Sequence, residues 1–434
     1  IKWYTSSQMG IHKKFTIISQ GCRLNHSETA NLVNEFQDKG LEQVGLEKKP
    51  DIVVINTCTV TENGDKDTIR LVRKINSSIN NVNIALIGCQ AQIKKSKLSE
   101  LKNVKWVIGN EFKNNTAKLI LSENTGVHAP KIKRETFFQE YSSFDPKHTR
   151  VNIKIQDGCD FYCSFCIIPF ARGPARSRDY NNIIDDAKGL INMGVKELVL
   201  TGINLGTYNN SGKDFYNLLE DLLNLNKDTR IRISSIEPTT IDTRLITMWK
   251  THSNFCQYLH LPIQSGTDEV LKSMRRKYSI KEYKDYIIDI KKHLPSLCIG
   301  TDVIVGFPGE TDALFESTFK LLKNNPIDYF HVFSYSERSM AHSRKFENII
   351  DKNTIKLRSL KLRTLHNEKW TAYMKTHINS VLPVLFEQEK NGFWHGTSEH
   401  FLKVKVKSDV SLKNKIKNIK LISINDKIIE GEMV

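Results

Sequence analysis

The chain has 434 residues, 39% of them hydrophobic, which is enough for two or three domains with ordinary buried cores. No apolar run reaches membrane-spanning length and no secretory leader pattern opens the chain, so we expect a cytoplasmic protein with no membrane partner. A formal net charge of +16, from 64 Lys and Arg against 48 Asp and Glu, favours a polyanionic partner such as RNA, although a solvated basic surface gives the same balance.

The first part of the chain alternates short apolar strands with helical patterns. Residues 1–8 show no core pattern and are expected to form a tail. Strands are predicted at residues 15–18, 52–55 and 84–87. Helical patterns between them, such as residues 27–36 and 65–75, predict that these strands lie parallel in one sheet.

One cysteine follows each of these strands: Cys22, Cys58 and Cys89. Ligand sites in parallel sheets form at the carboxyl ends of the strands, so the three thiols would converge there although no local motif joins them. The pattern therefore predicts a three-cysteine metal cluster. Three unrelated buried thiols are the alternative.

A polar connection, about residues 131–147, leads into a second domain built from repeated strand–helix units. Strands are predicted at residues 151–155, 197–200, 230–234, 257–261, 298–305 and 329–333. Amphipathic helical stretches lie between them. Six such units suit an incomplete parallel barrel, whose reactive groups would lie at the carboxyl ends of the strands.

Three thiols lie in the loop after the first of these strands: Cys159, Cys163 and Cys166. Three thiolates leave one iron of a four-iron cluster without a protein ligand, and that iron can bind a substrate or cofactor. A zinc site is the alternative, but the next candidate ligands, Cys256 and His260, lie far along the chain.

Four other residues of ligand type fall in or near the strand patterns of this domain. Cys256 and Cys298 are interpreted as buried, unreactive thiols. His260 and His331 are interpreted as hydrogen-bonded core histidines.

The spacing of Cys159, Cys163 and Cys166, with the aromatic Phe165 before the third cysteine, resembles the signature of the radical S-adenosylmethionine (SAM) enzymes. In that family SAM binds the open iron and is cleaved by one electron to methionine and a 5′-deoxyadenosyl radical. The resemblance implies a [4Fe-4S] cluster on these cysteines and SAM as a cofactor.

The segments around the first three cysteines add to the resemblance. They are Gly21–Asn25 with Ser27–Thr29, Asn56–Val60 and Gly88–Ala91. They are similar to the cluster-binding segments of the methylthiotransferases, radical SAM enzymes with two four-iron clusters, and the similarity covers essentially the whole chain. It implies a further [4Fe-4S] cluster on Cys22, Cys58 and Cys89.

Segments at the predicted strand ends resemble the SAM-binding elements of the family. Residues 201–204 match the motif whose backbone meets the SAM amino group, and residues 234–238 supply a carboxylate. The implied SAM contacts are Phe165, Thr201, Gly202, Ser235, Glu237, Gln264 and Gly306. Taken singly, each segment is also compatible with ordinary turn chemistry.

An arginine run follows the third cysteine of the second domain and contains Arg172, Arg176 and Arg178. These guanidinium groups can bind phosphates or position SAM. Structural ion pairs are an equally weighted alternative.

The pattern changes after the last predicted barrel strand. Residues 352–376 predict a helix that packs on the barrel through Leu357, Leu360, Leu365 and Trp370. Short strands are predicted at residues 381–387, 392–396, 401–407 and 416–424. This end resembles TRAM, the small all-β RNA-binding domain that closes methylthiotransferase chains.

Alternating lysines and nearby aromatic residues favour RNA binding by this last domain. Lys403, Lys405 and Lys407 would share one face of a strand. Aromatic rings able to stack on bases are Phe393, Trp394 and Phe401. An edge strand protected by lysines is the alternative.

The expected fold class is therefore α/β, with three domains. Residues 12–130 form a parallel α/β domain, residues 148–375 a partial (βα)6 radical SAM barrel, and residues 376–434 a TRAM-like all-β domain. Within the family the motifs most resemble the branch that modifies threonylcarbamoyladenosine in tRNA. One departure is Ser339–His342, where the family usually has Gly-Thr-Pro-Ala.

The resemblance implies an enzyme that adds a methylthio group at C2 of N6-threonylcarbamoyladenosine, beside the anticodon of tRNA. Its partners would be the anticodon stem-loop and a reducing protein such as flavodoxin or ferredoxin. Isopentenyladenosine in tRNA and an aspartate of a ribosomal protein are alternative substrates. A non-catalytic, metal-stabilised RNA-binding protein is the alternative of a different class.

Overall fold

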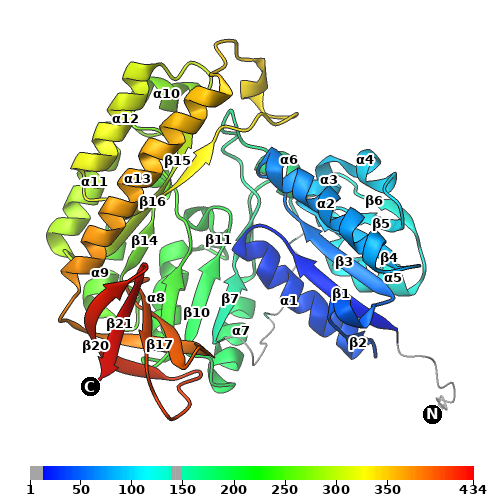
Figure 1. Ribbon diagram of the computed structural model, residues 1–434, viewed down its shortest axis with the longest axis horizontal. Coiled ribbons are helices and arrows are strands. Elements are labelled where there is room, and N and C mark those ends of the chain that lie inside the picture. The colour runs from blue at the N-terminus through cyan, green and yellow to red at the C-terminus, as the bar shows by residue number, and fades with distance from the viewer. Residues whose placement is uncertain (1–12, 136, 138–141, 143–148) are drawn as a thin grey trace. The chain divides into compact units, whose positions relative to one another are not determined.

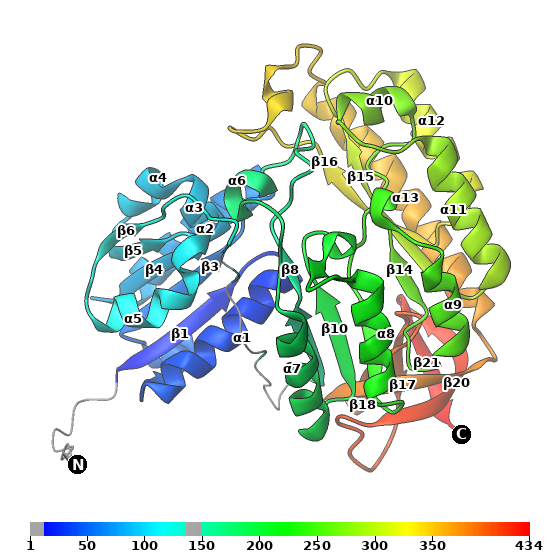
Figure 2. The same ribbon diagram turned by 180° about the vertical axis from the view of Figure 1, so that it is seen from behind.

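The computed structural model describes residues 13–135, 137, 142 and 149–434 (Figures 1 and 2). The expected tail and most of the predicted connection at residues 131–147 lie outside the described residues. The chain divides into two compact units, Ile1–Lys133 and Arg134–Val434. Across the described ranges, no helix combines the length and the hydropathy that crossing a membrane needs.

The first unit is built on a parallel sheet of six strands in the order β2-β1-β3-β4-β5-β6. The strands are β1 (Lys14–Ser19), β2 (Glu42–Gln43), β3 (Ile52–Thr57), β4 (Asn83–Gly88), β5 (Val104–Ile108) and β6 (Gly126–His128). The helices are α1 (Arg23–Asp38), α2 (Glu62–Ser78), α3 (Cys89–Ile93), α4 (Lys95–Ser99) and α5 (Thr116–Leu121). The predicted alternation of strand and helix is confirmed, and the sheet has three further strands, β2, β5 and β6, that were not predicted.

Burial on both faces explains why the central strands are continuous apolar runs. All six residues of β3 are buried. Val54 packs with Phe15 and Phe36 on one side of the sheet, whereas Val53 packs with Val72 on the other. A parallel sheet covered on both sides buries every position of its middle strands.

The second unit contains six parallel strands in two hydrogen-bonded sets, β13-β10-β7 and β14-β15-β16. They are β7 (Arg150–Lys154), β10 (Glu197–Thr201), β13 (Arg230–Ile233), β14 (Tyr258–His260), β15 (Cys298–Val305) and β16 (Tyr329–Ser334). Isolated parallel bridges join the sets at Ile231 with Phe255 and Ser235 with His260. Over the described residues no pairing joins β7 to β16, so this is the incomplete barrel that the sequence predicted.

Helices cover the outside of these strands, and short two-residue strands accompany the loops (Figures 1 and 2). The helices are α6 (Ile168–Arg172), α7 (Tyr180–Asn192), α8 (Phe215–Leu225), α9 (Arg244–Thr251), α10 (Asp268–Ser273), α11 (Ile280–His293), α12 (Asp312–Asn324) and α13 (Lys352–Thr376). The short strands are β8 (Gln156–Asp157), β9 (Arg176–Ser177), β11 (Asn209–Asn210) and β12 (Lys213–Asp214).

Alternation along the strands sorts side chains between the helices and the barrel interior. Leu198 and Leu200 of β10 belong to the main apolar core beneath the helices. Arg232 and His260, which point the other way, belong to a polar interior. The interior face of this barrel therefore carries the titratable groups.

The helix α13 has the predicted bounds, but only two of its four predicted packing residues, Leu365 and Trp370, pack against the rest of the protein. Leu357 and Leu360 are 67% and 61% exposed. The buried residues of the helix are Arg358, Ser359, Leu362, Leu365, Tyr373 and Met374. Of these, Arg358, Leu362 and Leu365 are spaced as one helical face. Apolar residues lie on more than one side of this helix, so counting them did not identify the side that packs.

The chain ends in a closed five-stranded barrel in the order β17-β18-β19-β21-β20. Its strands are β17 (Val381–Lys390), β18 (Phe393–Ser398), β19 (Lys403–Val406), β20 (Ile416–Asn425) and β21 (Ile428–Met433). The predicted small all-β fold is confirmed, although β21 was missed. Val404 and Val406 point into the barrel, so the three lysines around them point outward, as predicted.

This terminal barrel packs against the parallel strands through charged and aromatic groups. Arg230 and Arg232 are both paired with the buried carboxylate of Glu197. Arg232 also donates hydrogen bonds to the backbone carbonyls of Ser398 and Glu399, at 3.0 and 3.1 Å. Arg230 and Arg232 of β13 thus anchor the terminal barrel.

The same contact corrects our interpretation of two aromatic residues. The ring of Phe401 packs 4.8 Å from Tyr258 and 6.1 Å from Tyr329, centroid to centroid. Trp394 is only 8% exposed and lies in the core of the terminal barrel. Both rings are used for packing, so of the three aromatic candidates only Phe393 is left to stack on RNA bases.

Candidate active site

The loop with Cys159, Cys163 and Cys166 follows β8 and leads into α6, at the carboxyl end of β7. Backbone N–H groups point at two of its sulfurs: Phe161 donates to Cys159 Sγ at 3.5 Å and Ile168 to Cys166 Sγ at 3.4 Å. Donors of this kind stabilise thiolate charge. The loop geometry therefore suits metal-bound sulfur.

Burial keeps these thiols protonated when no metal holds them. It raises the pKa of Cys159 to about 11 and also raises the pKa of Cys166. Burial likewise raises the pKa of Cys163, although the guanidinium of Arg276 opposes the shift. A metal that binds here must displace protons from all three thiols.

Ser164, between two of these cysteines, ties the loop to its surroundings. Its N–H donates to the carbonyl of Met274 at 3.0 Å, and its hydroxyl to the carbonyl of Ser273 at 2.8 Å. Its own carbonyl accepts from the N–H of Ser343 at 2.8 Å. The cysteine loop is thus fixed to the end of α10 and to the segment after β16. The sequence carried no signal for this role.

Arg276 connects the cysteine loop to one of the predicted SAM residues. Its guanidinium pairs with the carboxylate of Glu237 and donates to Cys163 Sγ at 3.2 Å. Burial raises the pKa of Glu237, and the charge of Arg276 counters that shift. Glu237 is therefore brought next to the cysteines, as the resemblance implied.

Two other predicted SAM residues lie on the barrel interior near the strand ends. The hydroxyl of Ser235 is 2.8 Å from Nδ1 of His260, whose Nε2 is 3.2 Å from Asp302. Gln264, in a left-handed backbone conformation with φ of 69°, donates its N–H to the carbonyl of Asp302 at 2.8 Å. His260 on β14 is buried as expected, but His331 on β16 is exposed, so its interpretation as a core histidine is wrong.

The remaining predicted SAM residues have mixed surroundings. A Cβ on Gly202 would lie 2.9 Å from Leu205 and 3.1 Å from Gln156, so the backbone is closely approached there. Thr201 is fully buried, and its hydroxyl donates a hydrogen bond of 3.1 Å to the carbonyl of Ile153.

Gly306 and Phe165 lie in apolar surroundings. Gly306, with φ of 79°, is crowded by Ile355 of α13. Phe165 packs against an apolar cluster that contains Met274 and Phe307. Helix packing is thus sufficient to explain the glycine at position 306.

The arginine run forms structural ion pairs. Arg172 donates to the carboxylate of Asp157 at 3.0 Å, and Arg178 to that of Asp186 at 2.9 Å. Arg176 donates to the carbonyl of Arg172 at 2.7 Å. All three side chains are buried. The hypothesis that they bind phosphates or position SAM is therefore wrong, and the structural alternative holds.

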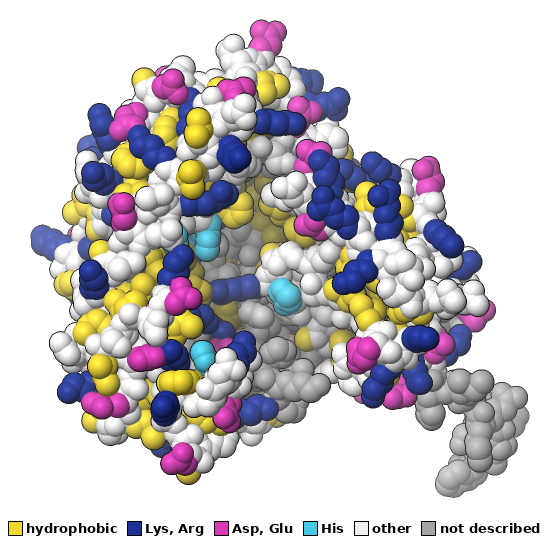
Figure 3. Space-filling view, viewed as in Figure 1, with side chains coloured by type: hydrophobic (Ala, Val, Ile, Leu, Met, Phe, Trp, Pro, Cys, Tyr) yellow, Lys and Arg dark blue, Asp and Glu magenta, His cyan; other side chains and the backbone are white. Residues whose placement is uncertain are grey.

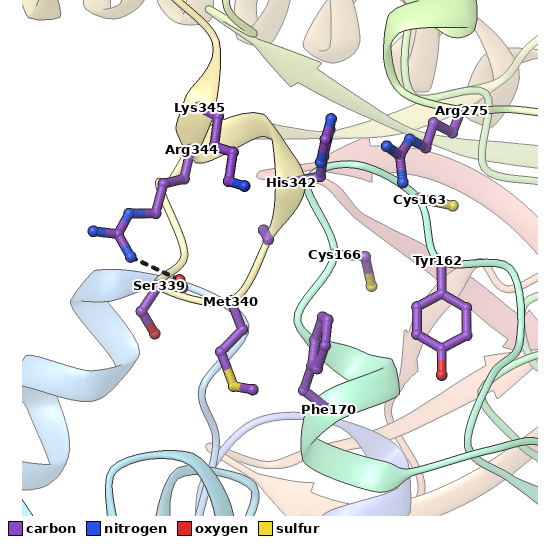
Figure 4. A pocket seen from close by; sticks show the side chains of 11 residues that line it. Tyr162, Cys163, Cys166, Phe170, Arg275, Ser339, Met340, His342, Arg344 and Lys345 are labelled. Carbon is purple, nitrogen blue, oxygen red and sulfur yellow. Dashed lines mark hydrogen bonds between the residues drawn. The ribbon is translucent and has the colours of Figure 1, made fainter.

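A pocket of about 520 Å³ opens beside the cysteine loop (Figure 4). It is lined by Tyr162, Cys163, Cys166, Phe170, Arg275, Ser339, Met340, Ala341, His342, Arg344 and Lys345. The unusual Ser339–His342 segment forms one wall, and no lining residue is acidic.

In the first unit, Cys22, Cys58 and Cys89 lie at the carboxyl ends of β1, β3 and β4, which are neighbours in the sheet. A Cβ added to Gly21, whose φ is 93°, would lie 2.7 Å from the sulfur of Cys58, so the first two loops touch. The amide of Asn110 donates to Cys89 Sγ at 3.5 Å. The three cysteine loops therefore lie at one edge of the sheet, where the strand spacing predicted them.

Two asparagines of the family-like segments lock these loops together. The side-chain amide of Asn25 donates to the carbonyls of Gln20 and Thr57, at 2.7 and 3.1 Å. Asn56 donates to the carbonyl of Asn25 at 2.9 Å. Asn25 and Asn56 thus hold the cysteine loops in place. The sequence alone gave no sign of this role.

Comparison with known proteins matches both units. The Radical SAM superfamily model matches residues 153–322, and the Uncharacterized protein family UPF0004 model matches residues 14–109. The chain is 34% identical to the threonylcarbamoyladenosine tRNA methylthiotransferase MtaB of Bacillus subtilis (strain 168), over 95% of each chain. It is 31% identical to the tRNA-2-methylthio-N(6)-dimethylallyladenosine synthase of Natranaerobius thermophilus, over 88% of each.

The chain belongs to the radical SAM methylthiotransferase family. Among solved structures, the radical SAM methyltransferase TsrM of Kitasatospora setae is similar in fold, with a TM-score of 0.55 at 12% identity over 74% of this chain and 73% of that one.

Methylthiotransferases use SAM and two [4Fe-4S] clusters, and the residues of this family member fit them. Each unit brings three cysteines to the carboxyl edge of a parallel sheet, with hydrogen-bond donors on sulfur. Beside the second set, the carboxylate of Glu237 suits a hydroxyl or ammonium group of SAM.

Proposed function

We propose that the enzyme transfers a methylthio group to C2 of N6-threonylcarbamoyladenosine in tRNA. The observation that carries the proposal is the pair of three-cysteine sites at two separate sheet edges, in a chain similar along 95% of its length to a methylthiotransferase named for that nucleoside. The dimethylallyladenosine synthases are nearly as similar, so the choice of substituent rests on the relatives named for threonylcarbamoyladenosine, at 34% identity against 31%.

In this proposal each cysteine set holds one cluster. Cys159, Cys163 and Cys166 hold the cluster that binds SAM, and Cys22, Cys58 and Cys89 hold the other. When bound, these groups supply the electron, the 5′-deoxyadenosyl radical and the sulfur that an aromatic C–H with no acidic proton requires. In this proposal the three domains are residues 12–130, which hold Cys22, Cys58 and Cys89, residues 148–375, which hold Cys159, Cys163 and Cys166, and residues 376–434.

The protein's own residues bind, orient and tune these groups. Arg276 places a positive charge on the sulfur of Cys163 and holds Glu237 for a hydroxyl or ammonium group of SAM. His260 holds the hydroxyl of Ser235, which faces the same interior. Phe165, Thr201, Gly202, Gln264 and Gly306 complete the proposed SAM contacts.

The partners in this proposal are the anticodon stem-loop of tRNA and a reducing protein such as flavodoxin or ferredoxin, both in the cytoplasm. Basic side chains gather over α2 in Figure 3, where Lys66, Arg70, Arg73 and Lys74 are exposed. On the terminal barrel, the ammonium of Lys407 lies 5.4 Å from the ring centre of Phe393. Positive charge beside a partly exposed aromatic ring suits single-stranded RNA.

Nucleoside analysis of tRNA from a strain that lacks the gene tests the substrate. We expect the methylthio form of threonylcarbamoyladenosine to disappear and its unmethylthiolated precursor to accumulate. Loss of the isopentenyl form instead, or of the modified aspartate of a ribosomal protein, would overturn the choice of substrate. Purified protein that holds zinc and no sulfide would support the non-catalytic RNA-binding alternative.

A further inference from the structure

The pocket beside Cys163 and Cys166 is strongly basic. Arg275, Arg344 and Lys345 line it together with His342, and no lining residue carries a carboxylate (Figure 4). Cations gathered without acidic partners repel one another, and an anion relieves that repulsion. The pocket therefore suits a negatively charged group.

The basic residues come from two segments that are already fixed to the cysteine loop. Arg275 follows α10, in a left-handed backbone conformation with φ of 60°. Lys345 ends the short 3-10 turn His342–Lys345 after β16. Ser164 bonds to both segments, through the carbonyl of Met274 and the N–H of Ser343. The backbone that carries these side chains is thus fixed before any ligand arrives, which lowers part of the entropy cost of binding.

Two of the cations are not used by the fold. Arg275 and Lys345 are exposed, and neither has an ion pair with any described residue. Their neighbours differ: Arg276 is paired with Glu237, and Arg344 donates to the carbonyl of Ser339 at 3.0 Å. Arg275 and Lys345 are therefore the groups available to a ligand.

The opposite side of the pocket is apolar. Tyr162 and Phe170 meet edge to face, with ring centres 6.1 Å apart. Met340, from the segment that also carries Lys345, adds a further apolar side chain. Aromatic rings beside cations suit a ligand with a flat or aliphatic body and an anionic end. A threonylcarbamoyl group on adenine has this composition.

The position of the pocket also matches the chemistry of the nucleoside. C2 and the N6 substituent of adenine flank N1 on the same edge of the ring. An enzyme that reacts at C2 must therefore accommodate the N6 substituent close to the reacting centre. Two of the proposed cluster cysteines line this pocket, so it adjoins that centre.

We propose that this pocket receives the N6 substituent, and that Arg275 and Lys345 bind its carboxylate. The inference rests on the proposed function, which supplies the anionic substituent. The guanidinium groups of Arg172 and Arg178 are not available for this role, because both are buried in ion pairs. It also gives the Ser339–His342 segment a place in the wall that faces the substituent.

Binding of anticodon stem-loops to the reconstituted full-length enzyme tests the proposal. Three stem-loops that differ only at the modified adenosine are compared: the threonylcarbamoyl form, its carboxyl methyl ester and unmodified adenosine. The wild type should bind the acid more tightly than the ester. Arg275→Ala and Lys345→Ala should each bind the acid about tenfold more weakly, as for loss of a charged hydrogen bond, and lose the preference for acid over ester. Binding of unmodified RNA should not change.

Matched variants separate this role from general effects. Arg275→Lys keeps the charge and should retain most of the preference. Lys272→Ala removes an exposed lysine of α10 outside the pocket and should leave all three affinities unchanged. Iron and sulfide contents equal to the wild type show that each variant is folded and loaded.

Other outcomes overturn the proposal in distinguishable ways. Equal weakening for all three stem-loops would show a contact with backbone phosphate, and weaker SAM binding without RNA would show a contact with the SAM carboxylate. Unchanged affinities would remove the pocket from recognition. If the wild type itself shows no preference for the threonylcarbamoyl form, the proposed substrate fails rather than the pocket.

Discussion

The two cysteine sites are built in different ways. Cys159, Cys163 and Cys166 come from one loop, and backbone N–H groups of the same loop point at its sulfurs. Cys22 and Cys58 follow separate strands and meet only because β1 and β3 pair in register. One site is therefore a local motif, whereas the other is a product of the sheet.

This difference predicts how each site responds to damage. A local loop retains its ligand spacing as long as its own turns form. A site assembled from three strand ends is lost when any one loop moves, because no short segment holds two of its ligands. Perturbing the sheet edge of the first unit should therefore empty the site of Cys22, Cys58 and Cys89 and spare the site of Cys159, Cys163 and Cys166.

Removing the ligands should produce the largest effects. The intact protein should hold about eight irons and eight sulfides, and each triple Cys→Ala variant about four. The variant at Cys159, Cys163 and Cys166 should lose all formation of 5′-deoxyadenosine. The variant at Cys22, Cys58 and Cys89 should lose methylthio transfer but still cleave SAM. Iron analysis and product chromatography under anaerobic conditions measure both.

Two results would contradict this division of roles. SAM cleavage at the wild-type rate in the variant that lacks Cys159, Cys163 and Cys166 would place the radical chemistry elsewhere. An iron content near four in the wild type would remove the cluster of the first unit.

Gly21→Ala should selectively empty the site formed by Cys22, Cys58 and Cys89. The added methyl would lie 2.7 Å from the sulfur of Cys58, at a φ of 93° that side chains rarely adopt. We expect about half of the iron to be lost and SAM cleavage to persist, since the other three cysteines retain their cluster. Gly40→Ala is the matched control, because Gly40 has a similar φ of 83° but nothing within 4 Å of a Cβ. Equal iron loss in both variants would mean that backbone strain, not the clash, is responsible.

A smaller effect is expected from Arg276→Met. The variant removes a positive charge and a hydrogen bond from the sulfur of Cys163, so the reduction potential of the cluster should become more negative. SAM cleavage should fall about 10- to 100-fold. Electron paramagnetic resonance during a redox titration measures the potential.

The partner carboxylate needs its own control. Without Arg276, Glu237 is a buried group whose pKa burial raises, so it takes up a proton at higher pH. Arg276→Met with Glu237→Gln removes both charges. If the double variant regains the wild-type potential, the effect of the single one comes from Glu237 rather than from the sulfur.

Elements with a strong local pattern could be predicted from the sequence. The bounds of β15 and α13 agree with the structure, because a long apolar run and a long helical pattern leave few alternatives. Strand spacing was likewise enough to place the loops of Cys22, Cys58 and Cys89 at one edge of the sheet.

Tertiary partners could not be predicted. The charges of Arg172 and Arg178 meet Asp157 and Asp186, and only the folded chain shows that these pairs are buried. Phe401 looked available to RNA because nothing in the sequence shows that it packs against Tyr258. The basic pocket was missed for the same reason, since its cations come from segments far apart in the chain.

The smallest effect is expected on the outer face of the terminal barrel. Lys405 is paired with Glu430 at 2.5 Å, so part of its charge is already neutralised, whereas Lys407 is exposed beside Phe393. Lys407→Ala should therefore weaken tRNA binding a few-fold, more than Lys405→Ala, and reduce the slope of log affinity against log salt by about one. Lys250→Ala on α9, an exposed lysine outside this barrel, is the control. Deleting residues 376–434 is a less informative test, because it would also uncover Tyr258 and leave Arg232 without its carbonyl partners. If the lysine variants keep both the affinity and the salt slope of the wild type, these lysines only protect a strand from pairing, and the RNA contact lies elsewhere.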